Sequence, residues 1–124
     1  MIDVVCGVIR KEGKFLITQR GDSKNLGKWE FPGGKVKVGE TYFESITREI
    51  KEELSLEIFP INQIVNYPFD RFNLIFILCK MKNPEFLPTL NEHLDYKWIG
   101  PDESNLFNFM EGDIQFVEKN LSSL

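Results

Sequence analysis

The chain has 124 residues, 42% hydrophobic and 27% charged, and carries a formal net charge of −4. This length suits one domain with a buried core, so we expect a single domain over residues 1–124. No apolar run approaches the ~18 residues of a membrane-spanning helix, and the N-terminus lacks the basic start and apolar middle of a secretory signal. The negative charge argues against binding to long nucleic acid. We therefore expect a cytoplasmic protein.

The first predicted elements form a β-hairpin. "DVVCGVI" and "KFLITQR", residues 3–9 and 14–20, are β-rich runs joined by "RKEGK", in which Gly13 suits a tight turn. Cys6 lies in the first run and Cys79 in a later apolar run, the usual setting of reduced, buried cysteines. We expect two free thiols.

The apolar period becomes helical after a glycine-rich loop. "WEFPGG", residues 29–34, has the composition of a backbone that must approach something closely. Thr41 and Glu44 then have the spacing of a capping box. One helix that ends near residue 54 is predicted from an apolar stripe made of Phe43, Ile46, Ile50 and Leu54.

The second half of the chain is predicted to contain four strands, and the fold class is therefore α/β. The third of these strands, "FNLIFILCKM", is the most apolar and is expected at the centre of the sheet. A C-terminal helix is predicted in "GDIQFVEKNL", with Asp113 as a plausible N-cap. The predicted strands are residues 56–60, 61–68, 72–81 and 94–100.

Three glutamates of the predicted helix, Glu49, Glu52 and Glu53, fall within one arc of about 100° beside the apolar stripe. Like charges three or four residues apart repel one another, and more strongly when partly buried. A divalent cation such as Mg²⁺ or Mn²⁺ would relieve the repulsion, because both prefer oxygen ligands. Arg48 can reach Glu44 and Glu52 at i±4 and would hold one carboxylate. The alternative interpretation is a solvated acidic helix face.

The spacing around these glutamates favours a site, because the segment resembles the Nudix box. Ser55 departs from that pattern, since the family usually has a glycine there, in a left-handed turn after the helix. The resemblance extends over nearly the whole chain: "GKWEFPGGK", "VIRKEGKFLITQR" and "YKWIG" are similar to the MutT-like and CTP-pyrophosphohydrolase-like branches. The matching box positions are Gly34, Glu40, Arg48, Glu49, Ile50, Glu52, Glu53 and Leu56.

The resemblance implies the Nudix fold, a mixed β-sheet sandwiched between helices in an α/β/α arrangement. It also implies hydrolysis of a nucleoside diphosphate linked to another group, through attack of water on phosphorus. By position, Glu49, Glu52 and Glu53 would bind Mg²⁺, with Mn²⁺ as a substitute, and Gly33 would contribute its carbonyl. One of Glu52 and Glu53, by preference Glu53, would act as the base. Glu92 matches a further acidic position that approaches the metal, the alternative being a solvated loop residue.

Three basic residues fall where relatives contact substrate. Arg20 follows the second strand, where the MutT-like branch has an arginine that contacts phosphate or sugar. Lys35 adjoins the box glycine, and Arg71 also falls in a matching place. Because exposed arginines and lysines are common, each has the alternative of being an ordinary surface residue.

The resemblance also bears on base recognition. Asp113 falls where the 8-oxoguanine-specific branch has an asparagine and the CTP-directed branch an aspartate, which predicts a preference for cytosine unless Asp113 is only a helix cap. Phe31 is expected in the pocket wall, whereas Trp29 and Phe72 are expected in the core. His93 is interpreted as an ordinary loop residue.

The resemblance therefore implies a small house-cleaning pyrophosphohydrolase that converts an NTP or dNTP to the monophosphate and pyrophosphate. Alternatives are an 8-oxo-dGTP diphosphatase, a hydrolase of nucleotide sugars or ADP-ribose, and a non-catalytic module that senses a nucleotide. The complete carboxylate set favours an enzyme. We expect a small nucleotide as the partner, no long nucleic acid and no membrane, and leave monomer or homodimer open.

Overall fold

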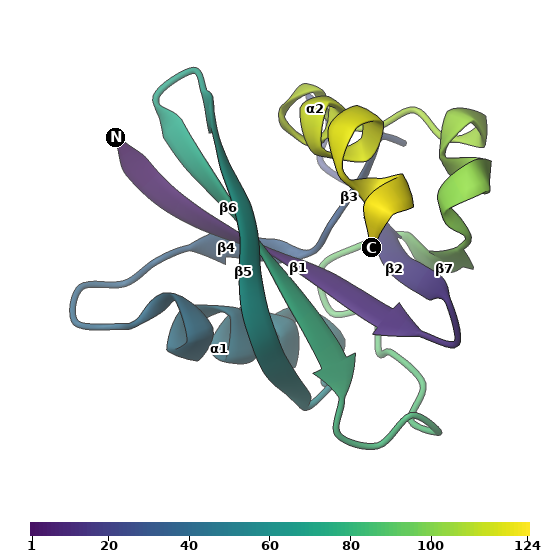
Figure 1. Ribbon diagram of the computed structural model, residues 1–124, viewed down its shortest axis with the longest axis horizontal. Coiled ribbons are helices and arrows are strands. Elements are labelled where there is room, and N and C mark those ends of the chain that lie inside the picture. Colours follow the sequence, from purple (N-terminus) through teal and green to yellow (C-terminus); the bar gives the residue numbers. More distant parts are fainter.

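The computed structural model describes residues 1–124 and shows one twisted mixed sheet with a helix on each face (Figure 1). The strands follow the order β3-β2-β1-β6-β5, while β4 pairs with β1 and β7 with β2. The strands are β1 (Ile2–Lys11), β2 (Lys14–Gln19), β3 (Trp29–Glu30), β4 (Gly33–Lys35), β5 (Ile58–Phe69), β6 (Phe72–Met81) and β7 (Asp95–Ile99). The helices are α1 (Tyr42–Leu54) and α2 (Glu111–Lys119), with 3₁₀ turns at Pro101–Leu106 and Leu121–Ser123.

Two hydrophobic clusters fill the two faces of the sheet. Successive residues of a strand point to opposite faces, so Val5 and Ile9 of β1 pack with α1 while Cys6 and Val8 pack with α2. The α/β/α arrangement is therefore confirmed. No helix has the length and apolar character that crossing a membrane requires.

The predicted hairpin is confirmed, and its turn consists of Glu12 and Gly13, both with positive φ. The expected position of the apolar strand is also confirmed: β6 lies between β1, to which it is parallel, and β5, to which it is antiparallel. The prediction of two strands over residues 56–68 was wrong. They form one long strand, β5, at the edge of the sheet, where two register shifts, one of them beside Pro60, keep it paired with β6.

Helix α1 begins with the predicted capping box, in which both the Thr41 and the Glu44 side chains accept backbone hydrogen bonds. Phe43 is not part of the buried stripe, since 40% of it is exposed. Tyr42, four residues before Ile46, packs on the sheet instead and donates a hydrogen bond to Asp3. Ile46, Ile50 and Leu54 are fully buried, as predicted.

The turn after α1 agrees with the prediction, whereas the start of α2 does not. Ser55 has φ 54° and ψ 34°, so the left-handed turn of the family pattern is kept without its glycine. The prediction of Asp113 as N-cap was wrong: α2 begins at Glu111 after Met110, and Asp113 lies inside its first turn. Cys6 and Cys79 are free and buried, as expected.

Candidate active site

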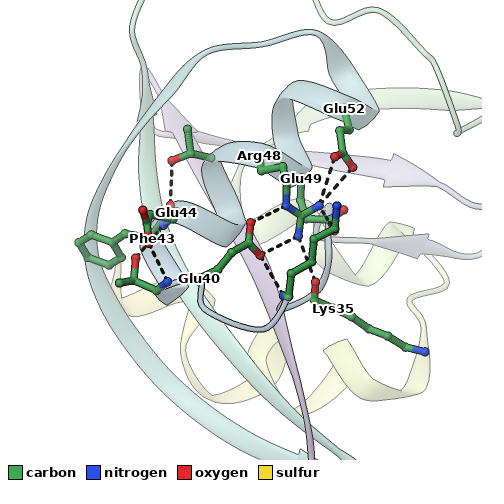
Figure 2. Close-up of polar contacts among 10 residues, drawn as sticks. Lys35, Glu40, Phe43, Glu44, Arg48, Glu49 and Glu52 are labelled. Carbon is green, nitrogen blue, oxygen red and sulfur yellow. Dashed lines mark hydrogen bonds and ion pairs between the residues drawn. The ribbon is translucent and has the colours of Figure 1, made fainter.

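Arg48 forms hydrogen bonds with three glutamates of the box (Figure 2). Its guanidinium donates two hydrogen bonds to Glu40, at 2.6 and 3.0 Å, and further bonds to Glu49 at 2.9 Å and Glu52 at 3.2 Å. The predicted contact with Glu44 is absent, because that carboxylate accepts the Thr41 N–H in the capping box instead. Arg48 therefore fixes the orientation of three box carboxylates.

Glu40 also fastens the loop that leads into α1. Its Oε1 accepts the backbone N–H of Lys37 at 2.9 Å. The hydrogen bonds from Arg48, and after them the Lys37 amide, lower the pKa of Glu40 to about 2. Glu40 is therefore ionised, and its hydrogen bonds link the loop to the helix.

Glu53 is the most buried carboxylate of the helix, with 5% of the residue exposed, and its Oε1 has no hydrogen-bond partner. Burial is the main cause that raises its pKa to about 9, followed by the charges of Glu30, Glu49 and Glu92, whereas a Gly33 backbone hydrogen bond opposes the rise. Burial also raises the pKa of Glu49, against the effect of Arg48. The buried Oε1 has no positive neighbour among its contacts.

These features suit a hard divalent cation, since a positive charge would satisfy the free Oε1 and lower both pKa values. No three acidic, histidine or cysteine side chains converge as a ready-made metal centre. Arg48 accounts for part of this, because it holds the carboxylates of Glu49 and Glu52. Glu52 is the more accessible of the two, with half of its side chain exposed.

Two glycines let β4 lie against this helix face. A Cβ on Gly34 would come within 2.5 Å of the Glu49 carboxylate, and one on Gly33 would come within 1.9 Å of the carbonyl oxygen of Val5 in β1. Gly34 therefore leaves space for a carboxylate, whereas Gly33 is required by the sheet itself. The role of the Gly33 carbonyl as a ligand stays a prediction.

A cleft of about 1030 Å³ opens above Glu49 and Glu53. Arg48 and Glu52 do not line it; they line a separate hollow on α1. The cleft brings together nine of the residues predicted for the site: Arg20, Phe31, Gly33, Lys35, Glu49, Glu53, Arg71, Glu92 and Asp113.

The basic residues of the cleft come from separate elements. Arg20, after β2, binds Asp22 at 2.7 Å and Glu30 at 3.2 Å. Lys35 lies at the end of β4, and its carbonyl accepts a hydrogen bond from Arg48. Arg71 lies at the tip of the β5–β6 hairpin with its guanidinium 5.1 Å from the Phe72 ring. Arg20 is thus held by carboxylates, whereas Arg71 has no carboxylate partner.

Asp113 joins α2 to the cleft wall. Its Oδ2 accepts the backbone N–H of Phe31 at 3.1 Å, and only 6% of Asp113 is exposed. Burial, and then the charge of Glu30, raises its pKa well above the usual value, although the Phe31 hydrogen bond opposes this. The buried Phe31 ring packs against the ring of Phe109, and Trp29 packs in the core against Phe107, as expected for Trp29.

The interpretation of His93 as an ordinary loop residue was wrong, because only 6% of its side chain is exposed and its Nε2 lies 2.9 Å from Glu30 Oε2. Both residues line the cleft, and neither was predicted to do so. Glu30 could have been suspected from "WEF", where a charge stands between two aromatic residues of a strand. The position of His93 follows from tertiary packing alone.

Comparison with known proteins assigns the chain to a family. The NUDIX domain matches residues 1–119, so the protein belongs to the NUDIX family. It is a hydrolase of this family, as its box predicted, and its fold is that of solved family members.

Two curated relatives illustrate the likeness. The CTP pyrophosphohydrolase of Escherichia coli K12 is 33% identical over 121 residues, which cover 95% of this chain and 90% of that protein. The 8-oxo-dGTP diphosphatase of Buchnera aphidicola is 36% identical over 110 residues, with coverage of 86% and 83%.

Among solved structures, the E. coli ORF135 protein superposes with a TM-score of 0.81 at 26% identity, covering 95% of this chain and 86% of that one. The MutT protein of Methanosarcina mazei Go1 gives 0.76 at 29% identity, with coverage of 95% and 91%.

Proposed function

We propose that this protein hydrolyses a nucleoside triphosphate, NTP or dNTP, to the monophosphate and pyrophosphate, and that the reaction depends on Mg²⁺ or, as a substitute, Mn²⁺. The observation that carries the proposal is the pair Glu49, partly buried, and Glu53, buried, in a cleft that Arg20, Lys35 and Arg71 also line. Carboxylates suit a cation, and basic side chains in the same cleft suit a polyphosphate. The relatives named for CTP and 8-oxo-dGTP support the same reaction class.

In this proposal Glu49, Glu52, Glu53 and the Gly33 carbonyl would hold the cation, with Glu92 of the β6–β7 loop as a further acidic residue of the site. A bound divalent cation supplies charge neutralisation on phosphate oxygens and a more acidic water. Arg48 holds the carboxylates of Glu49 and Glu52 in fixed positions on α1.

Glu53 is the proposed general base. Its carboxylate takes the proton of the attacking water. The water oxygen bonds to the α-phosphorus, the P–O bond of the α–β anhydride breaks, and pyrophosphate leaves with the electron pair. Glu53 can accept this proton only when it is ionised, and positive charge beside it lowers the pKa that burial has raised. The remote end of the triphosphate is bound by Arg20, Lys35 and Arg71.

For the nucleobase of the substrate, we propose a preference for cytosine. An ionised Asp113 accepts a hydrogen bond from the exocyclic amine of cytosine but cannot donate one to O6 of guanine. The burial of Asp113 favours a second candidate, an oxidised purine, because a protonated carboxyl group can donate.

Asp113→Asn separates base reading from a purely structural role. The side-chain oxygen of Asn can still accept the Phe31 N–H, so thermal stability should hold. Its NH₂ group can donate a hydrogen bond, so kcat/KM should move from CTP toward 8-oxo-dGTP. A specificity ratio within about twofold of the wild type would refute base reading by Asp113.

The setting proposed is the cytoplasm, with a small nucleotide as the only required partner and no long nucleic acid or membrane; a monomer or a homodimer would both serve. A panel of NTPs, dNTPs, 8-oxo-dGTP, ADP-ribose and nucleotide sugars, assayed with Mg²⁺ for kcat/KM, tests the substrate class. The triphosphates should lead the panel. Faster hydrolysis of ADP-ribose or a nucleotide sugar would contradict the proposal, and tight nucleotide binding without turnover would identify a sensing module instead.

A further inference from the structure

The loop between β6 and β7, residues 82–94, closes the C-terminal end of α1. The last four carbonyls of an α-helix have no donor within the helix. In α1 the chain supplies a donor for every one of them, and three of the donors come from this loop. The pairs are Ser55 N with Lys51 O at 3.0 Å, Asn91 Nδ2 with Glu52 O at 2.9 Å, Asn91 N with Glu53 O at 3.1 Å and Thr89 N with Leu54 O at 2.8 Å.

Asn91 makes most of this junction. Its backbone N–H and its side-chain amide bond to adjacent carbonyls of the helix, and the same amide lies 3.0 Å from Ser55 Oγ. Ser55 is the position at which this chain departs from the box pattern, and a glycine there would offer no such acceptor. Asn91 is therefore fastened to the last turn of the helix, two residues of which, Glu52 and Glu53, carry site carboxylates.

His93 makes a second attachment of the loop, to Glu30 of β3. Its Nε2 bonds to Glu30 Oε2, and Glu30 in turn accepts a hydrogen bond from Arg20 at 3.2 Å. The backbone N–H of the next residue, Leu94, bonds to the carbonyl of Gln19 in β2 at 2.9 Å. The loop is thus attached to the sheet immediately after Glu92 and to α1 immediately before it.

Glu92 lies between these two attachments and lines the cleft. Its charge is among the causes that raise the pKa of Glu49 and of Glu53, which line the same cleft. Without restraint, a loop carboxylate facing two others would move away into water, where repulsion is weaker and conformational entropy is gained. The two attachments oppose that movement.

We propose that Asn91 and His93 are positioning residues that hold the Glu92 carboxylate over the Glu49–Glu53 pair, Asn91 from the end of α1 and His93 from β3. The assignment deepens the proposed function and rests on it. Neither side chain needs to touch the nucleotide, since both act through Glu92.

Hydrogen exchange in the metal-free protein tests the attachment without any assay of activity. Asn91→Ala removes both side-chain bonds and should speed amide exchange of residues 89–94 by about tenfold. Asn83→Ala is the matched control, because Asn83 lies in the same loop but its side chain bonds only to the nearby Glu85 N–H. Exchange in Asn91→Ala as slow as in the control would overturn the attachment.

Kinetics test whether the attachment acts through Glu92. Asn91→Ala should lower kcat severalfold with little change in KM, while Asn83→Ala matches the wild type. Once Glu92→Gln has removed the carboxylate, adding Asn91→Ala should cost nothing more. Losses that multiply in the double variant would overturn the proposal.

His93 is tested by rescue. The amide of His93→Gln can still donate to Glu30 and should keep most of the activity, whereas His93→Leu should lose it to the extent that Glu92→Gln does. Equal loss in both His93 variants would contradict positioning through Glu30. A wild-type protein that hydrolyses no nucleotide would instead refute the proposed function, and the exchange experiment would still decide the attachment.

Discussion

Replacing Glu53 by Gln should remove a pH-dependent loss of stability from the metal-free protein, so the variant should gain on the wild type as pH rises. Burial and neighbouring charge raise the pKa of Glu53 from 4.5 to about 9. Between these values the folded protein keeps a proton that the unfolded chain has lost, so folding stability falls as pH rises. At about 1.36 kcal/mol for each pKa unit, the loss has a ceiling of about 6 kcal/mol above pH 9 and is about 3 kcal/mol at pH 7.

Glu53→Gln removes this loss. The buried amide introduces a cost of its own, about 1–3 kcal/mol, but that cost does not depend on pH. The diagnostic quantity is therefore the difference in melting temperature between variant and wild type, measured in EDTA from pH 5 to pH 8. It should widen in favour of the variant by roughly 15 °C, since about 4 kcal/mol separates pH 5 from pH 8 and each kcal/mol shifts the melting temperature by about 4 °C in a chain of this size.

Glu52→Gln is the matched control, since Glu52 is the adjacent residue and half of its side chain is exposed. Its difference from the wild type should widen less than that of Glu53→Gln, because Glu52 is not buried. With Mg²⁺ at pH 8 the wild type should gain more stability than Glu53→Gln, because binding to the folded state stabilises it, and Glu53→Gln should lower kcat by about 10²-fold or more. A difference in melting temperature that stays constant or narrows toward pH 8 would refute the account of Glu53.

The remaining predictions concern the supports of the site, and steady-state rates with Mg²⁺ and thermal melts in EDTA check them all. Gly34→Ala should displace the Glu49 carboxylate, lowering kcat at least tenfold while the metal-free melting temperature stays within a few degrees; normal activity would show that Glu49 is dispensable. Gly33→Ala should destabilise by about 3 kcal/mol or more, because its Cβ would meet the Val5 carbonyl, as severe core clashes do; an unchanged melt would contradict this. Arg48→Lys should lose about tenfold in kcat, since lysine cannot bond several carboxylates with a planar fork; wild-type kcat would refute the role of Arg48.

Helix α1 and its acidic face could be predicted because the information is local. The capping pair Thr41 and Glu44 and the apolar period from Ile46 lie within one segment. The same locality explains the failures. Phe43 fits the period, but Tyr42 fills the space on the sheet through a contact with Asp3, which is distant in sequence.

The sheet order and the second half of the site depend on contacts between distant segments. The parallel pairing of β1 with β6 joins residues about 70 positions apart, and no turn signal specifies it. Asp113 has cap-like spacing, yet it pairs with the Phe31 amide, which lies 82 residues away in the chain. His93 is buried for the same kind of reason, through Glu30.

In the proposed function, the Glu49–Glu53 cluster directs metal-dependent hydrolysis that releases pyrophosphate. Phosphorus NMR of the products from the best triphosphate of the panel, with Mg²⁺ and again with excess EDTA, tests it most directly. The products should be nucleoside monophosphate and pyrophosphate in equal amounts with Mg²⁺, and no turnover should occur in EDTA. Orthophosphate and the diphosphate as primary products, or undiminished turnover in EDTA, would contradict it.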